Sequence, residues 1–127
     1  MTQTVIADLP LSQDQRAALV GQQNDQFRSA FGANFTIPGS VVYTPGVSTL
    51  AFAWQLEIMT KVMTFSEFEE GDVDHGFGAF EVTIEDQSEQ FFWAITLYDN
   101  AREYGSPQPE DPKQTNRVLT IMLRSEY

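Results

Sequence analysis

Two neighbouring segments with a period of two most constrain what this chain can fold into. Phe80–Ile84 alternates cleanly between apolar and polar residues, and Phe91–Tyr98 is a strongly aromatic run that follows the polar connection Glu85–Gln90. Alternation is typical of a strand with one wet face, so the two segments predict a β-hairpin. The side chains expected to point into the core are Phe80, Val82 and Ile84, with Glu81 and Thr83 pointing outward.

Ahead of the hairpin, the chain carries the signals of a first helix. Ser12–Gln15 has the pattern of a capping box, and the apolar face that follows also holds Asn24. Gly32 is a plausible end for this helix. Because an unpaired buried amide would cost a few kcal/mol, we expect Asn24 to have a hydrogen-bond partner.

A second helix is expected from a cap at Ser48 to about Met63. It is unusual because it has two apolar stripes. One stripe consists of Leu50, Trp54, Ile58, Val62 and Phe65, and the other of Phe52, Leu56, Met59 and Met63. A small domain cannot easily cover both faces, so we expect a homodimer whose seam is the second stripe.

Two further strands complete the expected fold. Ser40–Thr44 is a β-branched run that stops at Pro45-Gly46, and Arg117–Leu123 is nearly continuous in apolar character. The latter is expected to be a strand buried on both faces, with a helix as the main alternative. The order α-β-α-β-β-β predicts one α+β domain over residues 1–127, with two helices packed on an antiparallel sheet of about four strands. Residues 1–11 are expected to form a loosely ordered N-terminal segment.

Composition excludes several classes of protein. The 127 residues include ten Phe, four Tyr and two Trp, which is enough apolar material for one core. The absence of cysteine excludes disulfides, thiolate zinc sites and cysteine nucleophiles. No signal peptide and no apolar run of membrane-spanning length are visible, so a cytoplasmic protein is expected.

The distribution of charge is the strongest indication of function. The formal net charge is −11, and residues 62–101 contain ten acids without one Lys or Arg. Such a field repels nucleic acid and anionic membranes and attracts cationic partners, although a well-solvated surface would look the same. The acids expected to bind a basic protein surface are Glu67, Glu69, Glu70, Asp72, Asp74, Glu85, Asp86 and Glu89.

The same region also allows metal-binding and catalytic interpretations. Acids beside His75, the only histidine, could offer oxygen ligands, but the twelfth residue of a calcium loop starting at Asp72 would be Thr83 rather than Glu. No metal or cofactor is therefore expected. His75 could act as a general base oriented by Asp72 or Asp74, and a carboxylate pair such as Glu81 with Asp99 could form across the hairpin. A small enzyme built on His75 is the alternative to a binding protein.

The chain also resembles a bacterial family of small uncharacterised proteins that is catalogued as a domain of unknown function. The resemblance extends from about residue 20 to residue 127. It rests on Asn24-Asp25, Phe27-Arg28, Val41–Val47, His75, Phe77–Val82, Phe92-Trp93, Tyr98-Asp99, Tyr104–Pro107, Asp111-Pro112, Thr115, Arg117–Leu123 and Glu126-Tyr127. Gly76 departs from the family, where an acidic residue commonly stands between the His and the Phe. The resemblance implies a bacterial or phage origin, often beside mobile-element genes, but no activity and no catalytic residues.

Charge and resemblance together predict a non-enzymatic acidic binding protein that does not itself bind nucleic acid. Its most concrete form is a nucleic-acid mimic, encoded by a phage or mobile element, that inhibits a bacterial defence complex such as a CRISPR effector or a restriction enzyme. The alternatives are the enzyme built on His75 and a homodimeric structural subunit sealed by the second helix.

Overall fold

A computed structural model describes residues 10–127 of the chain. Most of the segment expected to be loosely ordered, residues 1–9, lies outside the described part. The described elements run in the order α2 (Gln13–Ser29), β1 (Gly39–Tyr43), α3 (Pro45–Ser48), α4 (Phe52–Met63), β2 (Phe77–Ile84), β3 (Gln87–Tyr98), β4 (Asn116–Leu123) and the short 3₁₀ helix η1 (Arg124–Glu126). The predicted α+β class and the predicted number of strands are confirmed.

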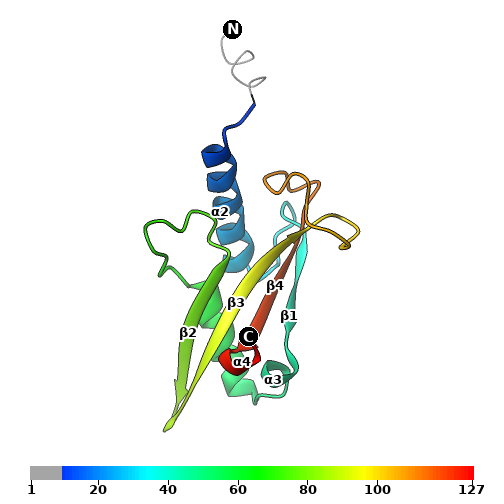
Figure 1. Cartoon of the computed structure of the whole chain (residues 1–127). Coiled ribbons are helices and arrows are strands. Elements are labelled where there is room, and N and C mark those ends of the chain that lie inside the picture. The colour runs from blue at the N-terminus through cyan, green and yellow to red at the C-terminus, as the bar shows by residue number, and fades with distance from the viewer. Residues whose placement is uncertain (1–9) are drawn as a thin grey trace.

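The four strands form one sheet in the order β1-β4-β3-β2 (Figure 1). β2 pairs antiparallel with β3, and β3 pairs antiparallel with β4. β1 runs parallel to β4, with Gly39 opposite Arg117 and Tyr43 opposite Ile121. The sheet is therefore mixed, and the expectation of a wholly antiparallel sheet was wrong at this one pairing. The sequence within β1 carries no signal for its direction, because direction is set by the pairing with β4.

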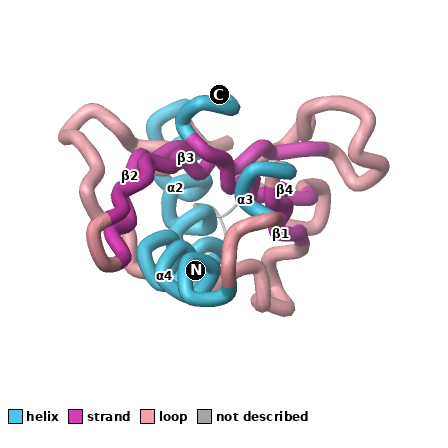
Figure 2. The backbone as a smooth tube through the Cα atoms, turned by 90° about the horizontal axis from the view of Figure 1, so that it is seen from below, coloured by secondary structure: helices cyan, strands magenta, loops and turns pink. Residues whose placement is uncertain are grey.

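The long helices α2 and α4 lie on the same face of the sheet, and η1 lies on the other (Figure 2). Side chains from both layers meet in a single core. Its buried apolar members are Phe27, Ile37, Val47, Ile58, Val62, Val82, Phe91, Trp93, Ile95, Leu119 and Ile121. One contiguous core under two helices is what a domain of this length can bury.

Helix α2 begins as its sequence predicts. Ser12 is the N-cap, its hydroxyl accepts from the Gln15 backbone N–H, and the Gln15 side chain accepts from the Ser12 N–H. This reciprocal pair satisfies two of the backbone donors that a helix N-terminus leaves free. The chain leaves the helix through Gly32, whose φ of +81° is a conformation that glycine adopts without strain.

The hairpin has the predicted register but a shorter connection. Phe80, Val82 and Ile84 pack toward the helices, whereas Glu81 and Thr83 are exposed. Ile84 pairs with Gln87, so the turn consists of Glu85 and Asp86 alone, with Glu85 at φ +56°. A two-residue turn with positive φ matches the twist of the strands that it joins. The polar residues after it belong to β3 and extend into solvent, which is why their sequence resembled a loop.

The expected second helix is split in two. Pro45, at the first position of α3, starts a single turn, and the Ser48 hydroxyl donates to the Pro45 carbonyl rather than capping α4. Ala51, in an extended conformation, is the N-cap of α4. The two apolar stripes of α4 behave differently. Ile58 and Val62 are buried against the sheet, whereas Phe52 and Leu56 are exposed.

Strand β4 is a strand, as predicted, but only one of its faces is covered completely. Arg117, Leu119 and Ile121 are buried under the helices, whereas the alternate side chains are half-buried. On the opposite face, Tyr127 packs against Phe77 and Phe92 with ring centroids 5.8 and 5.0 Å apart. This aromatic cluster covers part of that face, although Phe77 and Tyr127 themselves remain exposed.

No helix among residues 10–127 combines the length and the apolar character that crossing a bilayer requires.

The two stripes of α4 allow a direct test of which face is inside. Ile58→Ala should lower the free energy of unfolding by about 2–5 kcal/mol, because it opens a cavity in a fully buried position. Leu56→Ala, on the exposed stripe of the same helix, should cost about 1 kcal/mol or less. Urea denaturation of both variants measures the difference, and equal losses would contradict this orientation of α4.

Candidate functional site

The segment between α4 and β2, residues 64–76, is here called the acidic loop. It carries five of the acids that the sequence analysis selected, which are Glu67, Glu69, Glu70, Asp72 and Asp74. In Figure 1 it lies beside α2, at the end of the sheet where β2 begins. Helix α2 holds both ends of this loop through buried or half-buried contacts.

Arg28 of α2 anchors the start of the acidic loop. The residue is 3% exposed, its Nε donates to the Val62 carbonyl at 3.1 Å, and its Nη2 donates to the Phe65 carbonyl at 2.9 Å. These carbonyls belong to the end of α4 and the residues after it, where a helix leaves acceptors free and favours a cation. The guanidinium carbon also lies 4.8 Å from the Trp93 ring centroid and 5.2 Å from that of Phe68.

Asn24 and Asp25 of α2 anchor the end of the same loop. The Asn24 side-chain amide donates to the Asp74 carbonyl at 2.9 Å. The Asp25 carboxylate lies 2.9 Å from Nδ1 of His75, and it also accepts from Nη1 of Arg28 at 3.0 Å. The His75 ring stacks on Phe68 with centroids 3.8 Å apart and planes 1° apart. Asp25 therefore connects the two anchors.

Gly21 allows the loop backbone to approach α2. A Cβ built at this position would overlap the Val73 carbonyl oxygen, so only glycine fits against the loop. The loop closes on itself as well, because the Asp72 carboxylate accepts from the His75 backbone N–H at 3.0 Å. His75 has φ +52°, an uncommon conformation for a residue other than glycine, and this hydrogen bond and the contact with Asp25 hold it there.

A second buried cation lies beneath the same helix. Arg117 of β4 is fully buried; its Nε donates to the Asn24 side chain at 2.7 Å and its Nη2 to the Gln23 side chain at 3.0 Å. Burial lowers the pKa of Arg117 to about 10, so the group remains protonated at neutral pH. Asn24, which the sequence analysis expected to need a partner, has one on each side.

The eight selected acids do not form one patch. Glu67, Glu69, Glu70 and Asp74 are exposed on the acidic loop, and Asp72 is half-buried by its bond to His75. Glu85 and Asp86 form the hairpin turn at the other end of β2, whereas Glu67 on the acidic loop lies beside the middle of that strand. Glu89 was expected in the connection but lies in β3, opposite Val82. The structure thus brings five of the acids together and leaves three at the far end of the edge strand.

The catalytic and metal-binding interpretations receive little geometric support. The side chain of His75 contacts Asp25, not Asp72 or Asp74 as expected, and no hydroxyl group among residues 10–127 is hydrogen-bonded to its ring. Glu81 stands opposite Gln90, whereas Asp99 follows the far end of β3, so these carboxylates do not pair. Within the described chain, no group of three or more acids and histidine is placed to hold a metal ion.

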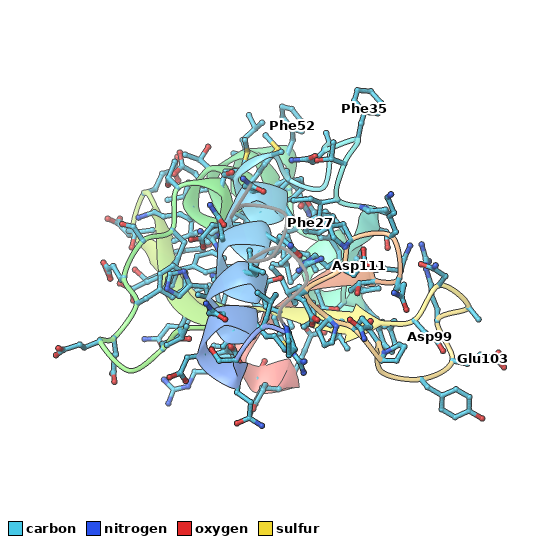
Figure 3. The ribbon with its side chains drawn as sticks, turned by 90° about the horizontal axis from the view of Figure 1, so that it is seen from above. Phe27, Phe35, Phe52, Asp99, Glu103 and Asp111 are labelled. Atoms are coloured by element: carbon cyan, nitrogen blue, oxygen red, sulfur yellow. The ribbon has the colours of Figure 1, made fainter. Side chains whose placement is uncertain are left out.

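The residues proposed for a dimer seam form an outward-facing surface on α4. Phe52 is 75% exposed and Leu56 is 44% exposed, whereas Met59 and Met63 are half-buried. Phe35, in the connection before β1, is fully exposed and points to the same side of the molecule as Phe52 (Figure 3). Phe35 was not predicted to belong to this surface, because a single apolar residue in a loop carries no periodic signal.

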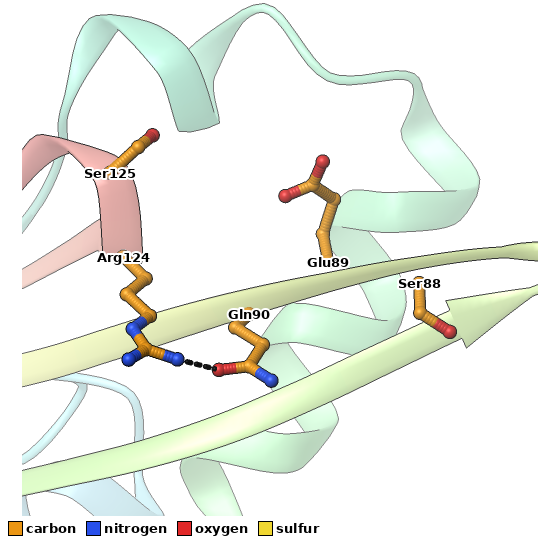
Figure 4. Close-up of a pocket in the computed structure, with 5 residues that line it drawn as sticks. All are labelled: Ser88, Glu89, Gln90, Arg124 and Ser125. Carbon is orange, nitrogen blue, oxygen red and sulfur yellow. Dashed lines mark hydrogen bonds between the residues drawn. The ribbon is translucent and has the colours of Figure 1, made fainter.

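One cavity lies away from the acidic loop. It has a volume of about 470 Å³ and is lined by Ser88, Glu89, Gln90, Arg124 and Ser125 (Figure 4). Arg124 donates to the Gln90 side chain at 2.8 Å across it. It is an open depression with a single exposed carboxylate and a single exposed guanidinium, and it lacks the buried polar groups that fix a ligand's orientation.

The close approach at Gly21 makes the anchoring of the loop testable. An alanine on a helix normally stabilises it by about 1 kcal/mol relative to glycine, but Gly21→Ala must displace the Val73 backbone. We expect a net loss of about 1–3 kcal/mol in the free energy of unfolding. Gly71→Ala, in open space on the same loop, is the control and should leave stability unchanged or slightly raised. A gain at Gly21 would disprove the contact.

Comparison with known proteins places the chain in a family. The comparison with curated proteins gave no match, and neither did the comparison with solved structures. Residues 43–126 match a family described as "Protein of unknown function (DUF3768)". The match includes the acidic loop and the strands β2, β3 and β4, and it begins after α2, whose side chains anchor the loop. This protein therefore belongs to the DUF3768 family.

Proposed function

We propose that this protein is a non-enzymatic binding protein of the cytoplasm that presents carboxylates to a basic surface on a partner protein. The observation that carries the proposal is that the fold buries some of its basic residues and leaves most of its acids exposed. Two of the seven basic residues, Arg28 and Arg117, are buried, which leaves five at the surface against a much larger number of acids. The outside of the molecule is therefore more one-sided in charge than the sequence alone suggests.

Seven of the eight selected acids are exposed, the exception being the half-buried Asp72. Within residues 10–127, none of the eight selected acids takes part in an ion pair. The acidic loop is held at both ends by Arg28, Asn24 and Asp25, so its conformation does not have to be ordered on binding. A preorganised surface loses less conformational entropy when a complex forms.

In its most concrete form, the proposal is a nucleic-acid mimic that inhibits a bacterial defence complex. A mimic must offer negative charges in succession to a groove that tracks phosphates. Carboxylates occur along the second half of the edge strand, from Glu67 beside its middle, through Glu81 on the strand, to Glu85 and Asp86 at the turn. The phage or mobile-element setting that the family resemblance implies suits such a role.

The test is to neutralise acids of the acidic loop and to compare the result with a control variant that has the same net charge. Glu67→Gln, Glu69→Gln and Glu70→Gln together should reduce binding to a partner captured from bacterial lysate at low salt by about tenfold or more. Each exposed pair alone is worth under about 1 kcal/mol, so the loss must come from the set. Wild-type affinity should fall steeply as salt rises.

The matched control is Asp14→Asn, Glu57→Gln and Glu103→Gln, three exposed acids elsewhere that give the same change in net charge. Glu103 lies on the side of the molecule opposite the acidic loop (Figure 3). The control should keep nearly the affinity of the wild type. If both triple variants bind equally well and the response to salt is flat, the acidity serves solubility and the proposal fails.

A second candidate role, self-association, is favoured by the exposed apolar surface of α4. Large apolar side chains are exposed there at Phe52 and Leu56, and Phe35 exposes another on the same side of the molecule as Phe52. Exposed apolar patches of this kind commonly mark interfaces. The role expected for this surface is a homodimer seam formed by Phe52, Leu56, Met59 and Met63.

Light scattering at micromolar concentration tests the seam. The wild type should have the mass of a dimer, and Leu56→Lys should shift it to a monomer, because a charge buried in an apolar seam is costly. The control is Glu57→Lys, at the next residue of α4, which is also exposed but does not belong to the seam. It should leave the mass unchanged. A monomeric wild type would remove this candidate.

A further inference from the structure

Strand β2 has a free edge. It is the outermost strand on its side of the sheet, and β3 takes only one set of its backbone groups. Ile84 and Gln87 flank a two-residue turn, so their backbone N–H and C=O groups bond to each other. Going back along β2, every second residue is bonded to β3 in the same way. This alternation extends to Gly76, just before β2, whose carbonyl accepts from the Ile95 N–H at 2.8 Å. The groups that point away from the sheet therefore belong to Phe77, Ala79, Glu81 and Thr83.

These outward groups have no partner among the described residues. No backbone hydrogen bond outside the regular elements involves a residue of β2, and no side chain bonds to its backbone. Several of the usual protections of an edge are missing, since β2 contains no proline, no lysine and no break in its pairing with β3, and Glu81 is its one charged residue. The opposite edge strand, β1, is shorter and lies between Pro38 and Pro45.

A groove runs beside the free edge. It has a volume of about 350 Å³ and separates the end of α4 and the start of the acidic loop from the middle of β2. Glu67 and Glu81 stand on its two sides, with Lys61 as its one basic residue. The half-buried Phe80, stacked on Phe91 at 5.3 Å, lines it from the sheet. The groove thus offers apolar surface and a net negative charge next to unpaired backbone groups.

We infer that the free edge of β2 accepts an extended basic segment of the partner protein as a fifth strand of the sheet. Backbone hydrogen bonds to Ala79, Glu81 and Thr83 would supply affinity, and cationic side chains would meet Glu67, Glu81 and the turn acids Glu85 and Asp86. A second copy of this chain is a poor occupant, because its own β2 would bring the same acids to the interface. The inference rests on the proposed function and names the form in which the basic partner binds.

The probe is a short synthetic peptide in which lysine alternates with threonine, followed by fluorescence anisotropy. Its control is the same peptide methylated at two adjacent central backbone nitrogens, which keeps the charge and blocks both edges of the strand. The methylated peptide should bind the wild-type protein about tenfold more weakly, as the loss of one or two backbone hydrogen bonds requires. This comparison uses only the intact protein, so no variant has to fold.

Hydrogen exchange then locates the contact. On binding of the unmodified peptide, the amides of Ala79, Glu81 and Thr83 should become protected, whereas those of Phe80 and Val82 are already bonded to β3 and should change little. Ala79→Pro removes one outward donor and no bond to β3, so it should weaken binding about tenfold, whereas Ala79→Val should not.

The outcomes separate the two ideas. If both peptides bind equally and the edge amides stay unprotected, while the Glu67, Glu69 and Glu70 triple variant weakens both, then the acidic surface binds cations and the strand-addition inference is wrong. If the triple variant binds both peptides as the wild type does, the proposed function fails as well. Protection of the edge amides in concentrated protein without peptide would identify a second copy as the occupant and overturn the inference.

Discussion

The arrangement of the molecule depends on the pairing of one buried cation. The Arg28 guanidinium is almost completely removed from water, and an unpaired charge in such a place would cost several kcal/mol. Its donors are satisfied only when the end of α4, the first residues of the acidic loop and Asp25 are all in position. A slide of α2 along α4 would break these bonds together, so the guanidinium fixes the relative placement of the two helices as well as the start of the loop.

The same pairing links the interior to the surface. Arg28 and Arg117 place two positive charges within the fold, near Trp93 and under Asn24 respectively. The surface therefore carries a negative excess larger than the net charge of the chain. Mutual repulsion of surface acids opposes compactness, and the buried hydrogen-bond network is one of the interactions that offset it. The buried arginines that stabilise this fold therefore also shape the surface charge that is proposed to serve binding.

Structural features that depend on neighbouring residues were predicted well from the sequence, whereas contacts between distant residues were not. The capping box at Ser12, the alternation in β2 and the need of Asn24 for a partner depend on neighbouring residues or on one buried group, and all three were confirmed. The pairing of Asp25 with His75 joins positions that are 50 residues apart, which no periodicity encodes. The parallel pairing of β1 and the burial of Arg117 have the same origin, since both result from where β4 lies in the sheet.

The position of β4 also governs the order in which the sheet can assemble. β2 and β3 can pair as soon as both have been synthesised, because a two-residue turn joins them. β1 precedes them along the chain, yet among residues 10–127 its sole neighbour in the sheet is β4, the last of the described strands to appear. A nascent chain therefore carries β1 with neither edge paired while α3, α4, β2 and β3 are made, and long-range pairing of this kind is slow. β1 is short and has a proline before and after it. Both properties disfavour pairing of the unpaired strand with other nascent chains.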